Sequence, residues 1–340
     1  MDLNTLWFVA IAIFFTVYFV LEGFDFGVGM SLPFLGGADA KESDARRSAA
    51  VQSIGPIWDG NEVWLIVAGG SIFAAFPEWY ATLFSGFYLP LLLILVALIV
   101  RGVAIEWRHK VDTLAWRKRC DAGIVFGSIL PAFLWGVAMT NIVTGVVFTS
   151  FGHVSSATAG FVGLLSPRGI LGGIAFILLF YLHGLFFLGL KCADPLRERA
   201  HHIARRGIAP LAVAVGAGYL LWMQLTVGKG WTWLAFLVAG GALAIALVAV
   251  WKGQDALAFY GTATAIIAVG VLLFGSLFPN LLPNVHATAN SVPGLDIYNA
   301  SASPYTLKIM SWASLLLAPC VLVGQGWSYW QFRKRVTVAH

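Results

Sequence analysis

Charged side chains are scarce in this chain. Asp, Glu, Lys and Arg make up only 11% of its 340 residues, whereas 59% of the residues are hydrophobic. The mean hydropathy is +0.83. A soluble domain of this length cannot bury so much apolar surface, but a lipid bilayer can. The composition therefore excludes a soluble protein and predicts a polytopic membrane protein.

Cysteine is rare as well. The three cysteines, Cys120, Cys192 and Cys320, lie far apart in the chain and form no C-x-x-C pair. Zinc sites and disulfide frameworks depend on closely or regularly spaced cysteines. The sequence therefore indicates neither kind of site.

Histidine and methionine, the usual axial ligands of heme, are also few. The chain has 7 histidines and 5 methionines, and His183 is the only histidine deep within a predicted span. A heme with two axial ligands would need two such side chains facing each other. The pattern favours an interior hydrogen bond for His183 over metal ligation, although its role stays open. We expect this chain to ligate no heme, copper or iron of its own.

Long apolar runs dominate what the chain does contain. Crossing a bilayer takes about 20 apolar residues at about 1.5 Å each, and nine segments qualify. Together they predict an all-α bundle that forms a single membrane domain over residues 1–340, with an external loop at 279–305. The predicted spans are 6–30, 57–76, 80–100, 122–147, 169–190, 208–227, 231–251, 256–278 and 308–331.

The basic residues predict the orientation of these spans. If the N-terminus is outside, all but three of the 21 Lys and Arg residues fall on the cytoplasmic side; the exceptions are Arg168, Lys229 and Lys308. Cytoplasmic loops collect Lys and Arg, so we expect the N-terminus outside and the C-terminus in the cytoplasm. The same loops account for the net charge of +5, and we expect no binding to nucleic acid.

Two pairs of carboxylates interrupt the first two spans. Glu22 and Asp25 are three residues apart in the first span, and Asp59 and Glu62 are three apart in the stretch 55–64 that opens the second. This spacing places each pair on one face of a helix, and the predicted topology places all four acids in the cytoplasmic leaflet. Acidic residues inside a membrane are costly and usually face a protein interior, a water-filled cavity or a partner.

Two interpretations of these acids stay open. In the functional interpretation they form a proton entry route, because carboxylates in an apolar setting can take up and release protons near neutral pH. In the structural interpretation they pair with Arg101, bind backbone groups or cap the second span. The structural interpretation is favoured for Glu22 and Glu62.

Tryptophan is abundant at the ends of the predicted spans. Most of the 14 tryptophans fit the aromatic belt that forms at a membrane interface. Trp58 differs because it directly precedes Asp59 in the chain. We keep Trp58 as a candidate site residue, whose indole could stack on a carboxylate or donate a hydrogen bond to it.

Six motifs occur along the chain in a characteristic order. They are Glu22-Gly-Phe-Asp-Phe-Gly-Val-Gly-Met30, Gly55-Pro-Ile-Trp-Asp-Gly-Asn-Glu-Val-Trp64, Phe73-Ala-Ala-Phe-Pro77, Ser85-Gly-Phe-Tyr88, Leu277-Phe-Pro279 and Thr306-Leu-Lys-Ile-Met-Ser-Trp312. Together they resemble subunit II of the cytochrome bd-type quinol oxidases. Their order and spacing match that family over nearly the whole chain, more weakly at 150–260.

The resemblance implies a respiratory enzyme of the bacterial cytoplasmic membrane. Members of this family are paired with a heme-bearing subunit I, which holds two hemes b and one heme d and the site of quinol oxidation; small single-span accessory subunits and membrane lipids are further expected partners. The complex oxidises quinol and reduces dioxygen to water with protons taken from the cytoplasm. On this basis subunit II is expected to lack heme ligands and to have no independent activity.

The resemblance also implies roles for particular acids. The family's subunit II is thought to contribute a cytoplasmic proton route along its interface with subunit I. The acids that match its pattern are Asp25 and Asp59. Glu22 occupies a position that can be Asp in relatives, and Glu62 one that can be Gln.

Two alternatives come from other functional classes. One is a proton-coupled secondary transporter, in which the acids would be coupling sites; such proteins often show inverted repeats and broken helices near the middle of the membrane, whereas the sequence shows no clear repeat and its acids lie off-centre. The other is a structural scaffold whose acids only hold the fold. Copurification with a heme protein would support an oxidase subunit over a transporter.

Overall fold

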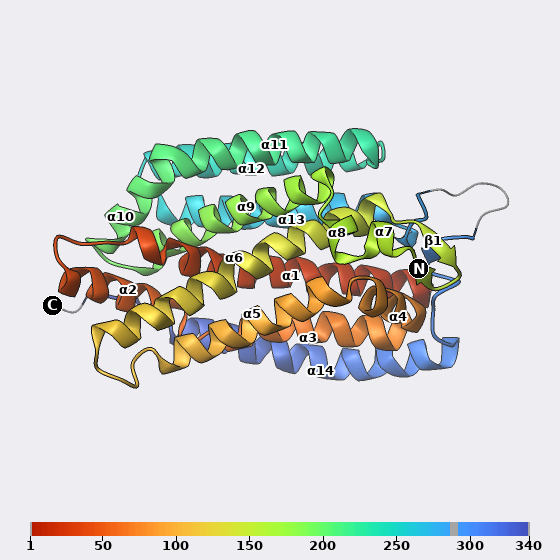
Figure 1. Ribbon diagram of the computed structural model, residues 1–340, viewed down its shortest axis with the longest axis horizontal. Helices are drawn as coiled ribbons and strands as arrows, with labels where there is room; N and C mark the ends of the chain where they lie inside the picture. The colour runs from red at the N-terminus through yellow and green to blue at the C-terminus, as the bar shows by residue number, and fades with distance from the viewer. Residues whose placement is uncertain (1, 286–291, 339–340) are drawn as a thin grey trace.

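The structure is a computed structural model that describes residues 2–285 and 292–338. It is an all-α bundle whose long helices run roughly along its longest axis (Figure 1), so the predicted fold class is confirmed. The described strands form two short antiparallel pairs, both in connections: β1 (Phe148–Ser150) with β2 (His153–Val154), and β3 (Asn280–Leu282) with β4 (Leu295–Asp296). The second pair lies in the predicted external loop, of which 286–291 are outside the described residues.

Eight helical stretches in the described part of the chain are long and apolar enough to span a membrane. A ninth results if α3 (Trp58–Ala75) and α4 (Pro77–Gly86), which are bent by 119°, count as one broken span. The eight are α1 (Leu3–Ser31), α5 (Tyr88–Trp107), α6 (Leu114–Thr144), α9 (Pro167–Lys191), α10 (Leu196–Ile203) continuing into α11 (Ala209–Thr226), α12 (Thr232–Trp251), α13 (Asp255–Leu277) and α14 (Pro304–Gln331).

The predicted third span, 80–100, differs most from the observed helices. Its first part belongs to the short helix α4, and the long helix α5 begins only at Tyr88 and continues to Trp107. Pro77 opens α4 because proline suits the first turn of a helix and cannot continue the preceding one. As a result Arg101, one residue beyond the predicted span, lies inside α5 and is fully buried.

The two ends of the bundle carry different connecting elements (Figure 1). The N-terminus lies at one end with β1, α7 (Ser156–Ala159) and α8 (Phe161–Leu164), and the C-terminus lies at the other end with α2 (Ala40–Ile54) and α10. Chain ends on opposite sides are what an odd number of spans requires. Which end faces the cytoplasm stays a prediction from the basic residues.

Helix α1 crosses α9 at very close range in the centre of the bundle. A Cβ atom on Gly27 of α1 would lie 2.1 Å from the carbonyl oxygen of Phe180, and one on Gly184 of α9 would lie 2.3 Å from the carbonyl carbon of Gly27. Small residues let membrane helices approach until their backbones touch. This crossing fixes α1, and with it Glu22 and Asp25, in the interior of the bundle.

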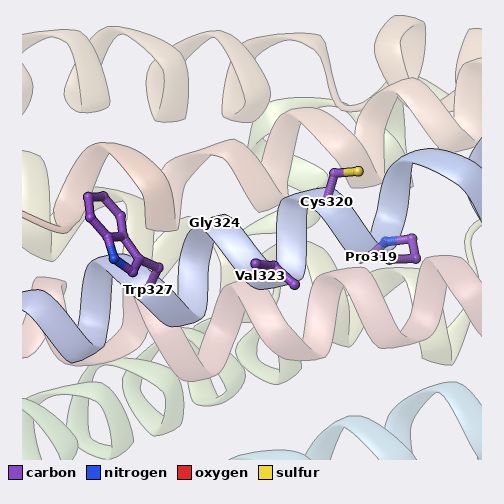
Figure 2. A pocket seen from close by; sticks show the side chains of 5 residues that line it. All are labelled: Pro319, Cys320, Val323, Gly324 and Trp327. Atoms are coloured by element: carbon purple, nitrogen blue, oxygen red, sulfur yellow. The ribbon is translucent and has the colours of Figure 1, made fainter.

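Helix α14 lies at the edge of the bundle beside α3 (Figure 1). Among the described residues of this helix only Leu307 is buried, and many large apolar side chains are exposed. A hollow of about 630 Å³ lies on this helix. Figure 2 shows the residues that line it, which are Pro319, Cys320, Val323, Gly324 and Trp327. An apolar face of this extent needs lipid or a protein partner to cover it.

Candidate functional site

A buried ion-pair cluster joins three helices. Glu22 of α1 and Arg101 of α5 are fully buried, and the Arg101 Nη1 group donates a hydrogen bond to Glu22 Oε1. The same Nη1 group lies 3.4 Å from Oε1 of Glu62 on α3, whose side chain is 21% exposed. A charge inside a membrane protein is tolerated when it is paired. The pairing of these acids with Arg101, one of the structural alternatives for Glu22 and Glu62, is therefore observed.

Arg101 is held in place by packing as well as by charge. Its guanidinium group lies over the ring of Phe26, 5.0 Å from the ring centroid. A Cβ atom on Gly127 of α6 would lie 2.4 Å from the Arg101 Cβ, so glycine is needed there for α6 to pack against α5. These contacts leave the arginine little freedom to move away from the acids.

The cluster has hydrogen-bonding capacity that the described residues do not satisfy. Buried atoms without a protein partner include Oε2 of Glu22, Oδ1 of Asp25, and Nε and Nη2 of Arg101. Buried polar atoms are nearly always hydrogen-bonded, to water where protein groups are lacking. Carboxylate oxygens that are free of protein donors can accept and pass on a proton.

Asp25 is fully buried beside this cluster and bonded to a polar chain that ends on α14. The Nδ2 group of Asn61, on α3, donates to Asp25 Oδ2 over 2.7 Å. The Asn61 Oδ1 atom accepts hydrogen bonds from the Tyr329 hydroxyl at 2.7 Å and from Gln325 Nε2 at 3.1 Å. The sequence analysis missed Asn61, Gln325 and Tyr329. Asn61 had one signal, its place between two acids in the stretch 55–64.

Asp59 is separated from the other predicted acids. It lies in the first turn of α3 with its side chain exposed on the surface of the bundle. Its neighbour Gly60 faces the side chain of Gln325, so Asp59 is on the edge of the bundle where α3 meets α14. The structure thus brings together Glu22, Asp25 and Glu62 but leaves Asp59 exposed on the surface.

Trp58 packs against α5 rather than against a carboxylate. A Cβ atom on Gly102 would lie 3.0 Å from Cη2 of the Trp58 ring, so the indole covers the helix at the residue that follows Arg101. The ring is half-buried. Trp58 therefore packs α3 against α5 at Gly102.

His183 of α9 has both ring nitrogens in hydrogen bonds. Nδ1 lies 2.7 Å from the Thr262 hydroxyl and Nε2 lies 3.1 Å from the carbonyl oxygen of Val20. The ring also stacks on Phe259, with 4.6 Å between centroids. This agrees with the expected interior hydrogen bond. Among the described residues, no group of three or more His, Cys, Asp or Glu side chains could hold a metal ion.

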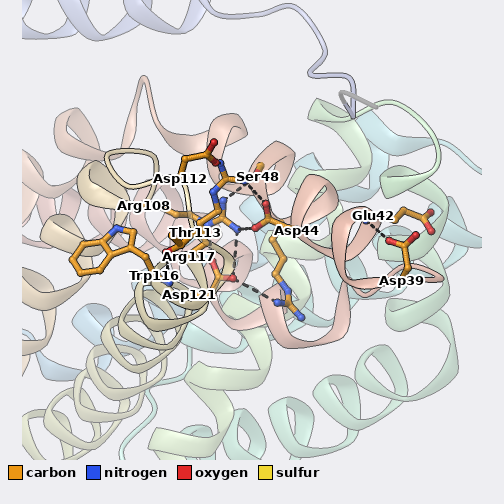
Figure 3. A network of polar contacts seen from close by, with 11 residues as sticks. Asp39, Glu42, Asp44, Ser48, Arg108, Asp112, Thr113, Trp116, Arg117 and Asp121 are labelled. Carbon is orange, nitrogen blue, oxygen red and sulfur yellow. Dashed lines mark hydrogen bonds and ion pairs between the residues drawn. The ribbon is translucent and has the colours of Figure 1, made fainter.

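A second ion-pair network lies at the end of the bundle that carries α2 (Figure 3). Arg108 is fully buried and donates to Asp121 Oδ1 at 2.6 Å, to the Ser48 hydroxyl at 2.7 Å and to Asp44 Oδ1 at 2.8 Å. Arg117 binds the other oxygen of Asp44 at 2.5 Å. The network ties α2 to the end of α5 and the start of α6. The sequence did not indicate it, because Asp44 and Ser48 lie 64 and 60 residues from Arg108.

The Asp44 carboxylate is held in its charged form. Burial raises the pKa of Asp44, but the hydrogen bond from Arg117 and the charges of Arg108 and Arg117 lower it by more, so that the net pKa lies below the ordinary value of 3.8. A carboxylate with a lowered pKa stabilises the folded state above its ordinary pKa, and this contribution is lost as the pH falls through the folded-state value.

Replacing Asp44 with Asn is therefore expected to destabilise the protein by about 1 to 3 kcal/mol at neutral pH, because Arg108 and Arg117 each lose a charged partner. The deficit in the midpoint of thermal unfolding should be the same at about pH 7 and about pH 5, since both lie above the ordinary pKa of 3.8. Asp112→Asn is the matched control: Asp112 also pairs with Arg117, but its side chain is 95% exposed, and exposed pairs contribute little. Equal deficits in the two variants would contradict this prediction.

Comparison with known proteins gives consistent results. Residues 3–332 match the family model for cytochrome bd terminal oxidase subunit II. The chain is 39% identical to cytochrome bd ubiquinol oxidase subunit 2 of Bacillus subtilis (strain 168), covering 99% of this chain and 97% of that protein. It is 30% identical to cytochrome bd-I ubiquinol oxidase subunit 2 of Escherichia coli (strain K12), covering 98% and 95%.

A solved structure shares the fold. A chain in the structure of bd oxidase from Geobacillus thermodenitrificans matches with a TM-score of 0.70 at 11% sequence identity, over 97% of this chain and 99% of that one. At such low identity this match concerns the fold alone, whereas the family assignment rests on the sequence. The chain is a multi-pass protein of the bacterial cytoplasmic membrane and belongs to the family of cytochrome bd terminal oxidase subunit II.

Proposed function

We propose that this chain stabilises the heme-bearing subunit I of a quinol-oxidising bd oxidase and supplies it with protons from the cytoplasm. Protons enter at Asp59 and pass to Asp25, with Glu22, Glu62 and Arg101 forming the surrounding polar cluster. The names of the relatives, which are ubiquinol oxidase subunits, support quinol as the substrate of the complex. Family membership favours this role over the alternative of a transporter.

The observation that carries the proposal is the buried carboxylate of Asp25. Its side chain is fully inaccessible, one oxygen is bound by Asn61, and the other has no partner among the described residues. A purely structural acid would be expected to have both oxygens satisfied. An acid with one free oxygen in an apolar bundle is suited to proton transfer.

The surface position of Asp59 supports its role as the entry point. An exposed carboxylate attracts protons and presents them to groups behind it, and surface charge of this kind raises local ion concentration. Asp59 lies on the edge formed by α3 and α14, next to the broad apolar face of α14. That face is our proposed contact with subunit I, which would place Asp59 at the boundary between the subunits and the cytoplasm.

The hemes of the complex are assigned to subunit I in this proposal. His183, the histidine in the middle of α9, does not fit an axial ligand because both of its nitrogens are engaged in hydrogen bonds inside the bundle. No step proposed for this chain runs through a heme. Its part is to hold and move protons.

Replacing Asp59 with Asn tests the entry role. We expect turnover of the purified oxidase complex to fall by about tenfold, with heme content close to that of the wild type, because asparagine keeps the shape of the aspartate side chain without its charge. Turnover and heme absorption should be measured on the same preparation. Unchanged turnover in an intact complex would rule out Asp59 as the entry point, and a joint loss of turnover and heme would indicate a structural role.

A further inference from the structure

Helix α14 reaches into the bundle through two polar side chains. The helix is otherwise exposed along most of its length, yet Gln325 and Tyr329, one turn apart, are half-buried, and both bind the Oδ1 atom of Asn61. Gly60 lies beside this contact, since a Cβ atom there would be in ordinary van der Waals contact with the Gln325 amide, 3.4 Å from its Oε1 atom. Two polar side chains of an edge helix thus converge on one buried amide.

The groups on the two sides of the Asn61 amide match one orientation. A carbonyl oxygen and an ionised carboxylate only accept hydrogen bonds, and an amide NH₂ group only donates. The Asp25 carboxylate therefore requires the Nδ2 group on its side, and Oδ1 then faces α14, where the Tyr329 hydroxyl and the Gln325 NH₂ group donate to it. In the opposite orientation the Asn61 oxygen would face the Asp25 carboxylate, which is unfavourable when Asp25 is ionised.

We propose that Asn61 is a positioning residue for Asp25 and that Tyr329 and Gln325 of α14 hold its amide in place. The amide holds Oδ2 of Asp25 and leaves Oδ1 free to exchange a proton. This inference rests on the proposed proton route and assigns control of its buried acid to the last helix. The other charged or titratable groups near Asp25 are Glu22 on its own helix, Glu62 on α3, Arg101 on α5 and Tyr329 on α14.

Loss of the hydrogen bond from Asn61 to Asp25 should change how turnover depends on pH. A hydrogen bond donated to a carboxylate favours its charged form, so loss of the Asn61 donor lets Asp25 keep its proton to higher pH. The part of the pH–turnover profile that depends on the protonation of Asp25 should then move toward higher pH. Hydrogen bonds to charged groups are strong enough to make this shift about one pH unit.

The experiment compares pH–turnover profiles of the intact oxidase complex carrying Asn61→Leu, Tyr329→Phe, or both. We expect a shift of about one unit upward for Asn61→Leu, a smaller shift in the same direction for Tyr329→Phe, and no further shift in the double variant, since Tyr329 acts through Asn61. Tyr305→Phe is the matched control, because Tyr305 lies on the same helix and is exposed; its profile should not move.

Three results would overturn the inference. They are additive shifts in the double variant, an unshifted profile for Tyr329→Phe, and a shift in the Tyr305→Phe control as large as that of Tyr329→Phe. Tyr329→Phe removes one oxygen atom only, so it keeps the test decisive if Asn61→Leu fails to assemble. Unchanged turnover in Asp25→Asn would instead contradict the proposed proton route itself. Reduced turnover in Asp25→Asn with unshifted profiles in the Asn61 and Tyr329 variants would reject the positioning role alone.

Discussion

Turnover of the oxidase complex is expected to fall by about a hundredfold when Asp25 is replaced with Asn. Positioned acid–base groups commonly contribute about 10²-fold or more to a rate, and the amide cannot carry a proton in the way that a carboxyl group does. Asparagine has nearly the same shape, and Asp25 makes no close ion pair with the described residues that the change would break. Heme content and assembly should therefore stay near those of the wild type.

The matched control for Asp25 is Glu106→Gln. Glu106 is an exposed carboxylate near the end of α5, so the control removes the same charge at a site outside the proposed route. Quinol oxidase turnover per heme is the quantity to compare. Normal turnover per heme in Asp25→Asn would contradict the route, and loss of heme in proportion to loss of turnover would favour the structural scaffold instead.

Replacing Arg101 with Met is expected to prevent normal assembly. The substitution leaves two carboxylates, Glu22 and Glu62, without their buried cation, and breaking a buried ion pair in this way costs about 3–5 kcal/mol. This is a large fraction of the stability of a folded protein. The amount of assembled complex in membranes and its midpoint of thermal unfolding are the measurements.

The double variant Arg101→Met, Glu22→Gln separates lost charge pairing from lost packing. Removing both charges of a buried pair is often close to neutral in stability, so the second substitution should restore much of the assembled complex. Arg119→Met, on the exposed surface at the start of α6, is the control and should assemble normally. Wild-type stability in the single Arg101 variant would refute the role of this cluster in holding α1, α3 and α5 together.

The structure places Glu22, Asp25 and Glu62 near one another and Asp59 apart from them, a difference that the sequence did not predict. The spacing of three residues predicted that Glu22 and Asp25 share one face of α1 and that Asp59 and Glu62 share one face of α3. The two pairs lie at similar heights along the bundle. Spacing alone treated Asp25 and Asp59 as equivalent. In the folded chain Asp25 is buried and Asp59 is exposed, because the rotation of each helix about its axis depends on what it packs against.

The partners of these acids come from distant parts of the chain. Arg101 was considered as a partner, but its burial followed only from the break between α4 and α5, which shifts the third span along the sequence. Gln325 and Tyr329 are more than 260 residues from Asn61. A local pattern carries no signal for such contacts, which depend on where the last helix docks.

By itself the sequence determined the membrane location, the helical fold and the family, because these depend on composition, on the length of apolar runs and on local motifs. Tertiary structure alone decided which carboxylates are buried, that Arg101 pairs with Glu22 and Glu62, and that the Asn61 amide binds Asp25. The reason is physical: hydrophobicity acts along the chain and can be read locally, whereas an ion pair or a hydrogen bond needs two groups within a few ångströms of each other, and only the packing of helices brings them there.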